Sequence, residues 1–320
     1  MDTQTIQLNT LPGLESLPDE VVYEESMPGH PNVPEKDPDY VFRIDDVRVI
    51  YGFLNHDGSE GLLFKGPTGS GKSSVIWQMH AYLGRPLFYI NGSVDLEYTD
   101  LVGTKEVIEG NTMTLDGPLV RAAGTPHASF LFEEMDRAPA EVSVALNPLL
   151  DGYGISSVLD QQVYTTEHGF KLIATANTGG GGDITGDYNT ANILDKSFLD
   201  RFWTHDVWYS GEDIEFKILR KRVSPSIEDE HIRQSIRLAN DIRYLYTGKD
   251  ESASSSAQSF AGHIDATFST RTLASFWSVM ELFQVDKPVE YALNLVIANQ
   301  CSDPCKEAIQ QIAEAHFSGF

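Results

Sequence analysis

The chain has 320 residues, of which 41% are hydrophobic and 10% aromatic, as expected for a soluble globular protein with one large domain or two moderate ones. Its 23 basic and 47 acidic residues give a formal net charge of −24, which disfavours bulk nucleic-acid binding and favours docking onto a basic protein surface. The sequence contains no apolar run long enough to span a membrane and no secretory signal, so we expect a cytoplasmic protein.

The first 40 residues differ in composition from the rest. They hold six prolines and nine acidic residues against one lysine, a composition that predicts an extended acidic arm or a disordered tail. A solvated leader is one interpretation. The other is a docking arm for a partner or a neighbouring subunit, anchored by Leu11, Leu14, Leu17 and residues 21–23.

Residues 41–210 alternate between short apolar runs and longer segments with helical periodicity. Each apolar run predicts a buried strand, and the segments between them predict helices. This alternation is typical of a parallel sheet flanked by helices, an α/β nucleotide-binding architecture. The predicted strands are 61–65, 86–90, 129–132 and 170–174, and the clearest helices are 72–83 and 138–150.

Residues 211–320 are helical in pattern and predict a small all-α domain. The expected helices begin at Gly211 and cover 228–246, 270–284 and about 303–316, with a Ser/Ala-rich flexible loop at 251–259. Cys301 and Cys305 are the two cysteines of the chain. A C-x3-C pair without a second pair or a histidine cluster is weak evidence for a metal, so we interpret both as structural cysteines.

The segment 66–73 matches the phosphate-binding pattern G-x-x-x-x-G-K-[ST] in full. Glycines allow a tight turn whose N–H groups point at phosphates, and the helix that follows adds its positive end. Lys72 is expected to reach the terminal phosphates of ATP and Ser73 to ligate Mg²⁺. A fortuitous glycine-rich turn is disfavoured because a strand precedes the segment and a helix follows it. The predicted nucleotide-binding residues are Gly66, Pro67, Thr68, Gly69, Ser70, Gly71, Lys72, Ser73 and Ser74.

Two carboxylates follow the strand 129–132 directly. A P-loop ATPase needs such acids at the end of a neighbouring strand, to hold Mg²⁺ and to polarise water. We expect Glu133 to lie at the metal and Glu134 to act as the base for the attacking water. The residue at the metal is usually Asp, and Glu133 is one methylene longer, so weak or slow hydrolysis remains an alternative.

Three polar residues further along the chain complete the predicted site. Asn177 ends the strand that begins near residue 170, where its amide can position the water between the carboxylate and the γ-phosphate. Arg201 is a candidate arginine finger for the nucleotide of an adjacent subunit, with an ordinary surface salt bridge as the alternative. Arg271, near a predicted helix start, is a candidate second sensor of the phosphates.

The order of these elements resembles the MoxR branch of the AAA+ ATPases, and within it the ATPase subunit of aerobic cobaltochelatase and its phage-borne relatives. The resemblance covers roughly residues 37–285. It is carried by the P-loop and by segments 37–42, 100–103, 116–119, 133–139, 174–178, 182–188 and 200–202. It implies ATP and Mg²⁺, a homo-oligomeric ring that is often a hexamer, a hairpin inserted at 104–115 near the pore, and a small helical lid domain.

Four functions are compatible with these patterns. The leading hypothesis, implied by the resemblance, is a ring ATPase that remodels or activates a partner protein, commonly one with a von Willebrand factor A domain. A second is the ATPase subunit of a cobalt or magnesium chelatase-like complex. A third is a nucleotide-gated binding scaffold with weak hydrolysis, motivated by Glu133 and the acidic arm. A DNA-acting motor is disfavoured by the net charge of −24.

Overall fold

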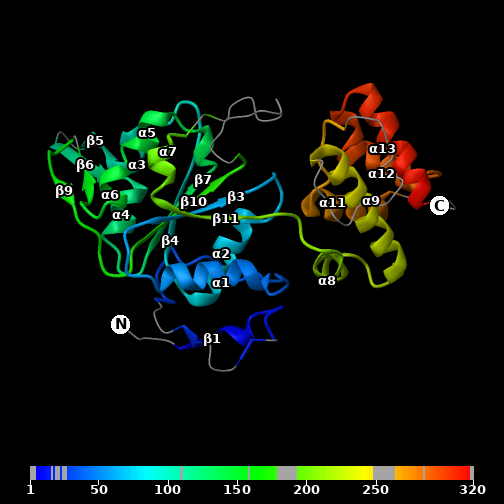
Figure 1. The fold of residues 1–320 in the computed structure, drawn as a ribbon, viewed down its shortest axis with the longest axis horizontal. Coiled ribbons are helices and arrows are strands. Elements are labelled where there is room, and N and C mark those ends of the chain that lie inside the picture. Colours follow the sequence, from blue (N-terminus) through cyan, green and yellow to red (C-terminus); the bar gives the residue numbers. More distant parts are fainter. Residues whose placement is uncertain are drawn as a thin grey trace. The chain divides into compact units, whose positions relative to one another are not determined.

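The chain folds into two compact units, one with a central sheet and one that is helical (Figure 1). Residues 1–67 and 71–208 form the first unit, and residues 209–320 together with 68–70 form the second. The structure is a computed structural model that describes residues 5–15, 17–18, 22–23, 27–108, 111–157, 159–178, 192, 194–247, 264–283 and 285–317. Val21 and the segments 182–188 and 251–259, named in the sequence analysis, lie outside the described residues.

The first unit is built on a five-stranded sheet in which every neighbouring pair is parallel, with the strand order β11-β3-β10-β7-β4. The strands are β3 (Gly61–Lys65), β4 (Leu87–Asn91), β7 (Ser129–Glu133), β10 (Lys171–Ala176) and β11 (Phe202–Asp206). The helices are α1 (Ile44–Leu54), α2 (Lys72–Leu83), α3 (Tyr98–Val102), α4 (Pro118–Ala123), α5 (Ala140–Val144), α6 (Asn147–Leu150) and α7 (Lys196–Leu199). The predicted α/β fold is thus confirmed.

Successive residues of the strands bury against opposite faces of the sheet, because side chains alternate along a strand. Phe64 and Leu131 pack with α1 and α2 in one core, whereas Leu63, Phe130 and Phe132 pack with α3 to α7 in the other. Strands covered on both faces read as continuous apolar runs. This is why the sequence predicted the inner strands so directly.

Two elements of this unit differ from the prediction. The expected helix 138–150 is divided into α5 and α6, and Pro148 lies in the first turn of α6. Proline has no N–H to donate to the carbonyl of Val144 four residues earlier, which interrupts the helical hydrogen bonds there. The strand β11 was not predicted, because it lies at the sheet edge and leaves side chains such as Trp203 exposed.

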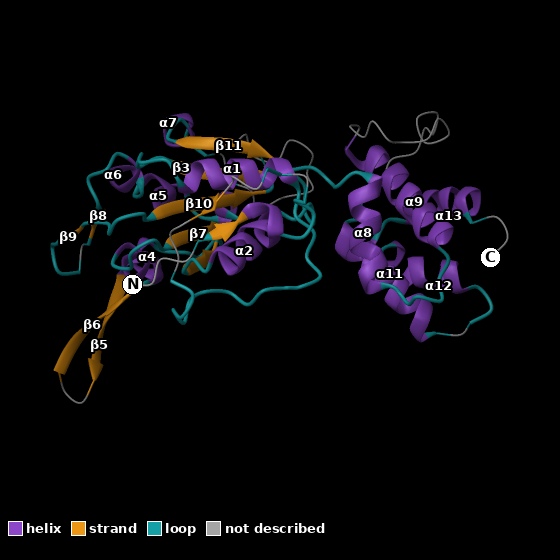
Figure 2. Ribbon diagram, turned by 90° about the horizontal axis from the view of Figure 1, so that it is seen from below, coloured by secondary structure: helices purple, strands orange, loops and turns teal. Residues whose placement is uncertain are grey.

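An antiparallel hairpin and a short ribbon accompany the sheet. The hairpin strands β5 (Gly103–Ile108) and β6 (Asn111–Asp116) coincide with the predicted insert 104–115. Figure 2 shows this hairpin projecting away from the sheet. Val107, Met113 and Leu115 are exposed on it. The ribbon pairs β8 (Ile155–Ser156) with β9 (Val163–Tyr164), and a 3-10 turn, η2 (Met135–Arg137), follows β7.

The N-terminal arm packs on its own unit. It contains the paired strands β1 (Ile6–Gln7) and β2 (Val22–Tyr23) and the 3-10 turn η1 (Leu8–Thr10). Leu8, Leu11 and Leu14 are at most 1% exposed and belong to the core formed with α1 and α2. The solvated-leader interpretation is therefore wrong for these residues, and the predicted anchors Leu11 and Leu14 are used within the chain.

The second unit is a bundle of helices with its own apolar core. Its helices are α8 (Glu212–Arg222), α9 (Asp229–Thr247), α11 (Thr270–Leu282), α12 (Pro288–Val296) and α13 (Asp303–His316), with the 3-10 turn η3 (Ala298–Gln300). The sequence had not indicated α12. A buried ion pair joins Arg243 to Glu215 at 2.7 Å, and Thr270 Oγ1 donates to the same carboxylate, which fixes the start of α11. None of the described helices has the length and hydropathy needed to cross a membrane.

Candidate nucleotide-binding site

The predicted phosphate loop connects β3 to α2 at the carboxyl edge of the sheet. Gly66 has φ +150°, and a Cβ atom there would lie 1.9 Å from the carbonyl oxygen of Val207, so the backbone requires glycine. Gly71 has φ +93° and is the N-cap residue of α2, where no side chain caps the helix. The N-cap residue thus offers no side-chain acceptor to the first N–H groups of α2, and a phosphate fits that position.

The side chain of Lys72 contacts Asn177, the residue that follows β10. Its Nζ donates to Asn177 Oδ1 at 2.9 Å, and also to the carbonyl oxygens of Gly66 at 2.7 Å and Pro67 at 3.0 Å. Burial lowers the pKa of Lys72 to about 8, although the charges of Asp136 and Glu134 act in the opposite direction. Two carboxylates of the loop after β7 therefore lie within electrostatic reach of the P-loop ammonium.

Glu133, the last residue of β7, is oriented toward α2. Its Oε1 accepts a hydrogen bond of 2.8 Å from Nε1 of Trp77. Trp77 lies four residues after Ser73 in α2, so both side chains stand on the same face of that helix. The longer side chain of Glu133 thus reaches an indole that holds its carboxylate beside the helix of the predicted metal ligand Ser73.

Glu134 has a left-handed backbone, with φ +47° and ψ +45°. A non-glycine residue in this region costs about 1 kcal/mol or more, and such strain gathers at functional sites. Its N–H donates to Thr175 Oγ1 at 3.0 Å, which links the loop after β7 to the neighbouring strand β10. Its half-exposed carboxylate is paired with Arg137 at 2.6 Å.

Asp136 is a residue whose importance the sequence reasoning missed. It is 1% exposed, and its Oδ2 accepts hydrogen bonds from the N–H groups of Asn177 and Thr178, each at 2.9 Å, and from Thr178 Oγ1 at 3.0 Å. Its Oδ1 is buried and receives no hydrogen bond from the described part of the chain. Asp136 therefore fixes the backbone that carries Asn177. Its place two residues after Glu134, and the polar Thr175 within an apolar strand, were the available signals.

Arg201 lies beside the amino ends of the strands, whereas the phosphate loop lies at their carboxyl ends. Its carbonyl oxygen accepts from the N–H of Gly61, at the beginning of β3, whereas the phosphate loop follows the end of β3. The guanidinium forms a two-pronged ion pair with Asp151, at 2.8 and 3.0 Å, and lowers the pKa of that carboxyl. Arg201 thus does not meet the Lys72 site of its own chain, and the salt bridge left open by the sequence is present.

Arg271 belongs to the second unit. It is the second residue of α11 and is exposed, and the Oγ atom of Ser269 caps that helix by accepting from the N–H of Thr272 at 3.1 Å. The structure thus supplies a fixed helix start for Arg271. Its predicted contact with phosphate stays a proposal.

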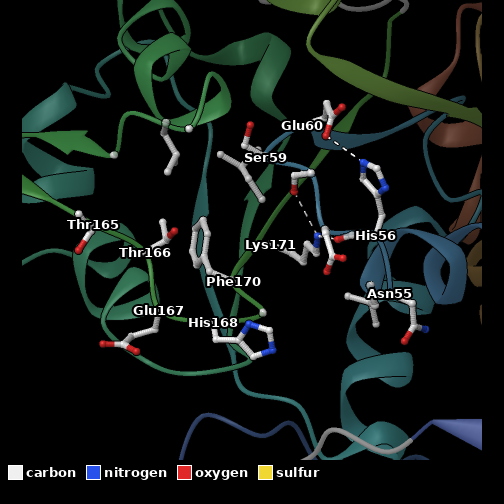
Figure 3. A pocket seen from close by; sticks show the side chains of 18 residues that line it. Asn55, His56, Ser59, Glu60, Thr165, Thr166, Glu167, His168, Phe170 and Lys171 are labelled. Atoms are coloured by element: carbon white, nitrogen blue, oxygen red, sulfur yellow. Dashed lines mark hydrogen bonds and ion pairs between the residues drawn. The ribbon is translucent and has the colours of Figure 1, made fainter.

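A pocket of about 430 Å³ in the first unit is lined by a different set of residues (Figure 3). The loop after α1 and the segment before β10 line it, and it contains the ion pair between His56 and Glu60 at 3.1 Å. None of the predicted nucleotide-binding residues lines this pocket. The candidate site is therefore defined by the contacts among Lys72, Asn177 and the carboxylates after β7.

Several known proteins are similar to this chain. Residues 61–202, from the start of β3 to the start of β11, match the family of AAA domains of the dynein-related subfamily. The chain is 26% identical over 286 residues to the aerobic cobaltochelatase subunit CobS of a Sinorhizobium species, covering 86% of this chain and 80% of that protein. It is 28% identical over 280 residues to an uncharacterised protein of Staphylococcus aureus, covering 85% and 95%. A solved RuvB mutant from Thermotoga maritima is 12% identical, with a TM-score of 0.46, covering 81% and 71%.

The strand order and the matched domain define the class: this is an AAA+ ATPase fold with a P-loop on β3. Residues 61–202 match the AAA domain of the dynein-related subfamily, in agreement with the MoxR-type resemblance of the sequence. Proteins of this class use a nucleotide, typically with Mg²⁺, and they commonly assemble into rings.

Proposed function

We propose that the protein is an ATP-hydrolysing ring ATPase that remodels or activates a partner protein. The observation that carries this proposal is the hydrogen bond between Lys72 and Asn177, which joins the phosphate loop to the end of β10. The charges of Asp136 and Glu134 reach the same ammonium. A phosphate-binding cation, a polar amide and a carboxylate base are the groups that phosphoryl transfer to water requires in one place.

Each residue has a distinct task in this proposal. The N–H groups at the start of α2 and the Lys72 ammonium bind the phosphates, with Lys72 exchanging its carbonyl partners for phosphate oxygens. Asn177 orients the attacking water, and Glu134 takes its proton after leaving Arg137. Thr175 accepts a hydrogen bond of 3.0 Å from the N–H of Glu134, and Asp136 accepts one of 2.9 Å from the N–H of Asn177. These bonds fix the positions of Glu134 and Asn177.

The residues present fit a magnesium ion. The Ser73 hydroxyl and the Glu133 carboxylate offer hard oxygen ligands, and Mg²⁺ is normally held by one or two protein oxygens together with substrate phosphates and water. The hydrogen bond from Trp77 fixes the direction of the Glu133 carboxylate at 2.8 Å. Bound Mg²⁺ would neutralise charge on the phosphates of ATP.

The partner assignments rest on class resemblance and on charge. We propose a homo-oligomeric ring, often a hexamer in this class, in which Arg201 serves the nucleotide of the neighbouring subunit. A client protein with a von Willebrand factor A domain is the proposed partner. The charge of −24 favours a client with a basic contact surface.

Two alternative functions are supported by specific observations. The 26% identity with a cobaltochelatase subunit supports the ATPase subunit of a chelatase-like complex. The presence of Glu133 at the metal position, and the pairing of Glu134 with Arg137 at 2.6 Å, support a nucleotide-gated scaffold with weak hydrolysis. Turnover indistinguishable from buffer, despite tight ATP binding and ring formation, would favour the scaffold. ATP turnover stimulated by DNA at physiological salt would instead favour a DNA motor.

We expect Lys72→Ala to weaken ATP binding about 10- to 150-fold, because a hydrogen bond to a charged group contributes about 1.5–3 kcal/mol. In the unchanged protein, affinity should fall as the pH rises above about 8, since the lowered pKa of Lys72 releases its proton there and phosphate binding requires the charged form. Fluorescent-nucleotide titrations from pH 6.5 to 9.5 measure both effects. Lys217→Ala, on the exposed side of α8, is the matched control. Equal affinities for the two variants would contradict the proposed site.

Asp136 should act through the position of Asn177 rather than on ATP binding. Asp136→Ala leaves two N–H groups without their acceptor, and we expect kcat to fall at least about tenfold with KM changed less than about threefold, since a buried donor left unpaired costs about 1–3 kcal/mol. Asp136→Asn keeps one acceptor oxygen and should restore part of kcat. Asp45→Ala, on an exposed carboxylate of α1, is the control. A rise in KM without loss of kcat would refute this role.

A further inference from the structure

Three potential metal ligands converge in the second unit. Asp265 precedes α11, Cys301 follows η3, and Cys305 lies in the first turn of α13. The two sulfur atoms and one carboxylate oxygen all lie within 4.8 Å of one another. Two segments separated by more than thirty residues in the sequence thus deliver three ligand atoms to one point.

We propose that Asp265, Cys301 and Cys305 form a binding site for a thiophilic divalent cation, with zinc as the best fit. Thiolates select zinc over magnesium and calcium, which require oxygen ligands. Zinc–sulfur bonds of about 2.3 Å in a tetrahedral site place two sulfurs roughly 3.8 Å apart. A group already within 4.8 Å needs a movement of only about 1 Å to reach that geometry.

The fold holds these ligands in place. Cys305 is 1% exposed and belongs to the helical core, whereas Cys301 is half-buried. The N–H of Ser302 donates to Asp265 Oδ2 at 3.2 Å, and this bond ties the carboxylate to the start of α13. The sulfurs therefore form the buried side of the site, and the exposed Asp265 forms its open side.

The open side leaves the fourth tetrahedral position to water or a small ligand. Binding of Zn²⁺ to two thiols and one carboxylate forms two zinc–sulfur bonds and one zinc–oxygen bond and releases the two thiol protons to solvent. No electron transfer is involved. The ion would join the segment leading into α11, which carries Arg271, to the C-terminal helix.

A simpler interaction uses the same geometry. The Cys305 thiol hydrogen-bonds to Asp265 and lowers the pKa of that carboxyl. A thiol–carboxylate hydrogen bond alone would give the two cysteines no affinity for zinc. Direct metal binding therefore separates the two interpretations without any measurement of ATP turnover.

The test uses the full chain, treated with a chelator and kept under a phosphine reductant. We expect calorimetry to show one Zn²⁺ bound per chain, and Cd²⁺ to produce thiolate-to-metal charge-transfer absorption. Cys301→Ser and Asp265→Asn should each weaken zinc binding at least about tenfold, as changes around a metal site commonly do. Asp303→Asn, in the same turn of α13, is the matched control and should bind as the unchanged protein does. Zinc should also raise the midpoint of thermal unfolding, because a ligand that binds the folded state stabilises it.

Two results would overturn the proposal. One is the absence of zinc binding and of cadmium–thiolate absorption in the unchanged chain. The other is equal zinc affinity in the unchanged chain and in Cys301→Ser, which would place the ion elsewhere. Because Cys305 is buried, its replacement can unfold the helical unit. The half-buried Cys301 and the exposed Asp265 therefore carry the test, with circular dichroism to verify folding.

Discussion

Glu134→Gln should reduce ATP turnover by about 10²- to 10⁴-fold, the usual contribution of a positioned base, while ATP binding is retained. Glutamine matches the shape of Glu134 but cannot take a proton from water. The N–H of Glu134 should still donate to Thr175 Oγ1, because that bond uses the backbone. Steady-state turnover together with nucleotide titration measures the separation between chemistry and binding.

The ion pair between Glu134 and Arg137 is weak enough to leave the carboxylate available as the proposed base. Arg137 holds the carboxylate at 2.6 Å, and both side chains are about 45% exposed, so the pair contributes little to stability and can open. Glu141→Gln, on the exposed side of α5, is the matched control and should leave turnover unchanged. Full turnover in Glu134→Gln would show that Glu134 is not the base.

Much of the fold could be predicted from the sequence because its inner strands are buried on both faces. Runs such as 129–132, in which three large apolar residues follow one serine, favour a strand that is buried on both faces. The edge strand β11 lacked that signal, since Trp203 is 40% exposed and the polar residues Thr204, His205 and Asp206 follow it. The helix break before Pro148 follows from the missing N–H of proline and was open to prediction.

In the candidate site, too, some features could be predicted from the sequence and others could not. The phosphate loop and the carboxylates after β7 follow from residue types that the chemistry demands, at strand ends that a parallel sheet brings to one edge. The direction of Glu133 toward Trp77, and of Arg201 toward Asp151, depends on side-chain positions across the tertiary structure. No spacing in the sequence encodes those partners. Asp136 lay in a segment noted for its resemblance, but its three hydrogen bonds required the structure.

Arg201→Ala should lower ATP turnover about 10³- to 10⁵-fold if Arg201 is an arginine finger. The register of β11 on β3 excludes its own nucleotide as the target, because Arg201 lies beside the first residue of β3. The five residues of β3, roughly 16 Å of extended strand, separate it from the phosphate loop. We therefore propose that Arg201 reaches the nucleotide of a neighbouring subunit. Each active site would then need residues from two chains.

Mixing inactive variants tests this arrangement. Lys72→Ala subunits keep Arg201, and Arg201→Ala subunits keep the phosphate loop, so mixed rings contain interfaces with both residues intact and should recover part of the turnover. Asp151→Asn is the matched control, because it breaks the ion pair of Arg201 without removing the guanidinium. That pair is partly exposed and contributes about 0–1 kcal/mol, so this control should remain active. The absence of rescue at any ratio, together with a loss of turnover in Asp151→Asn, would mean that Arg201 acts within its own subunit through Asp151.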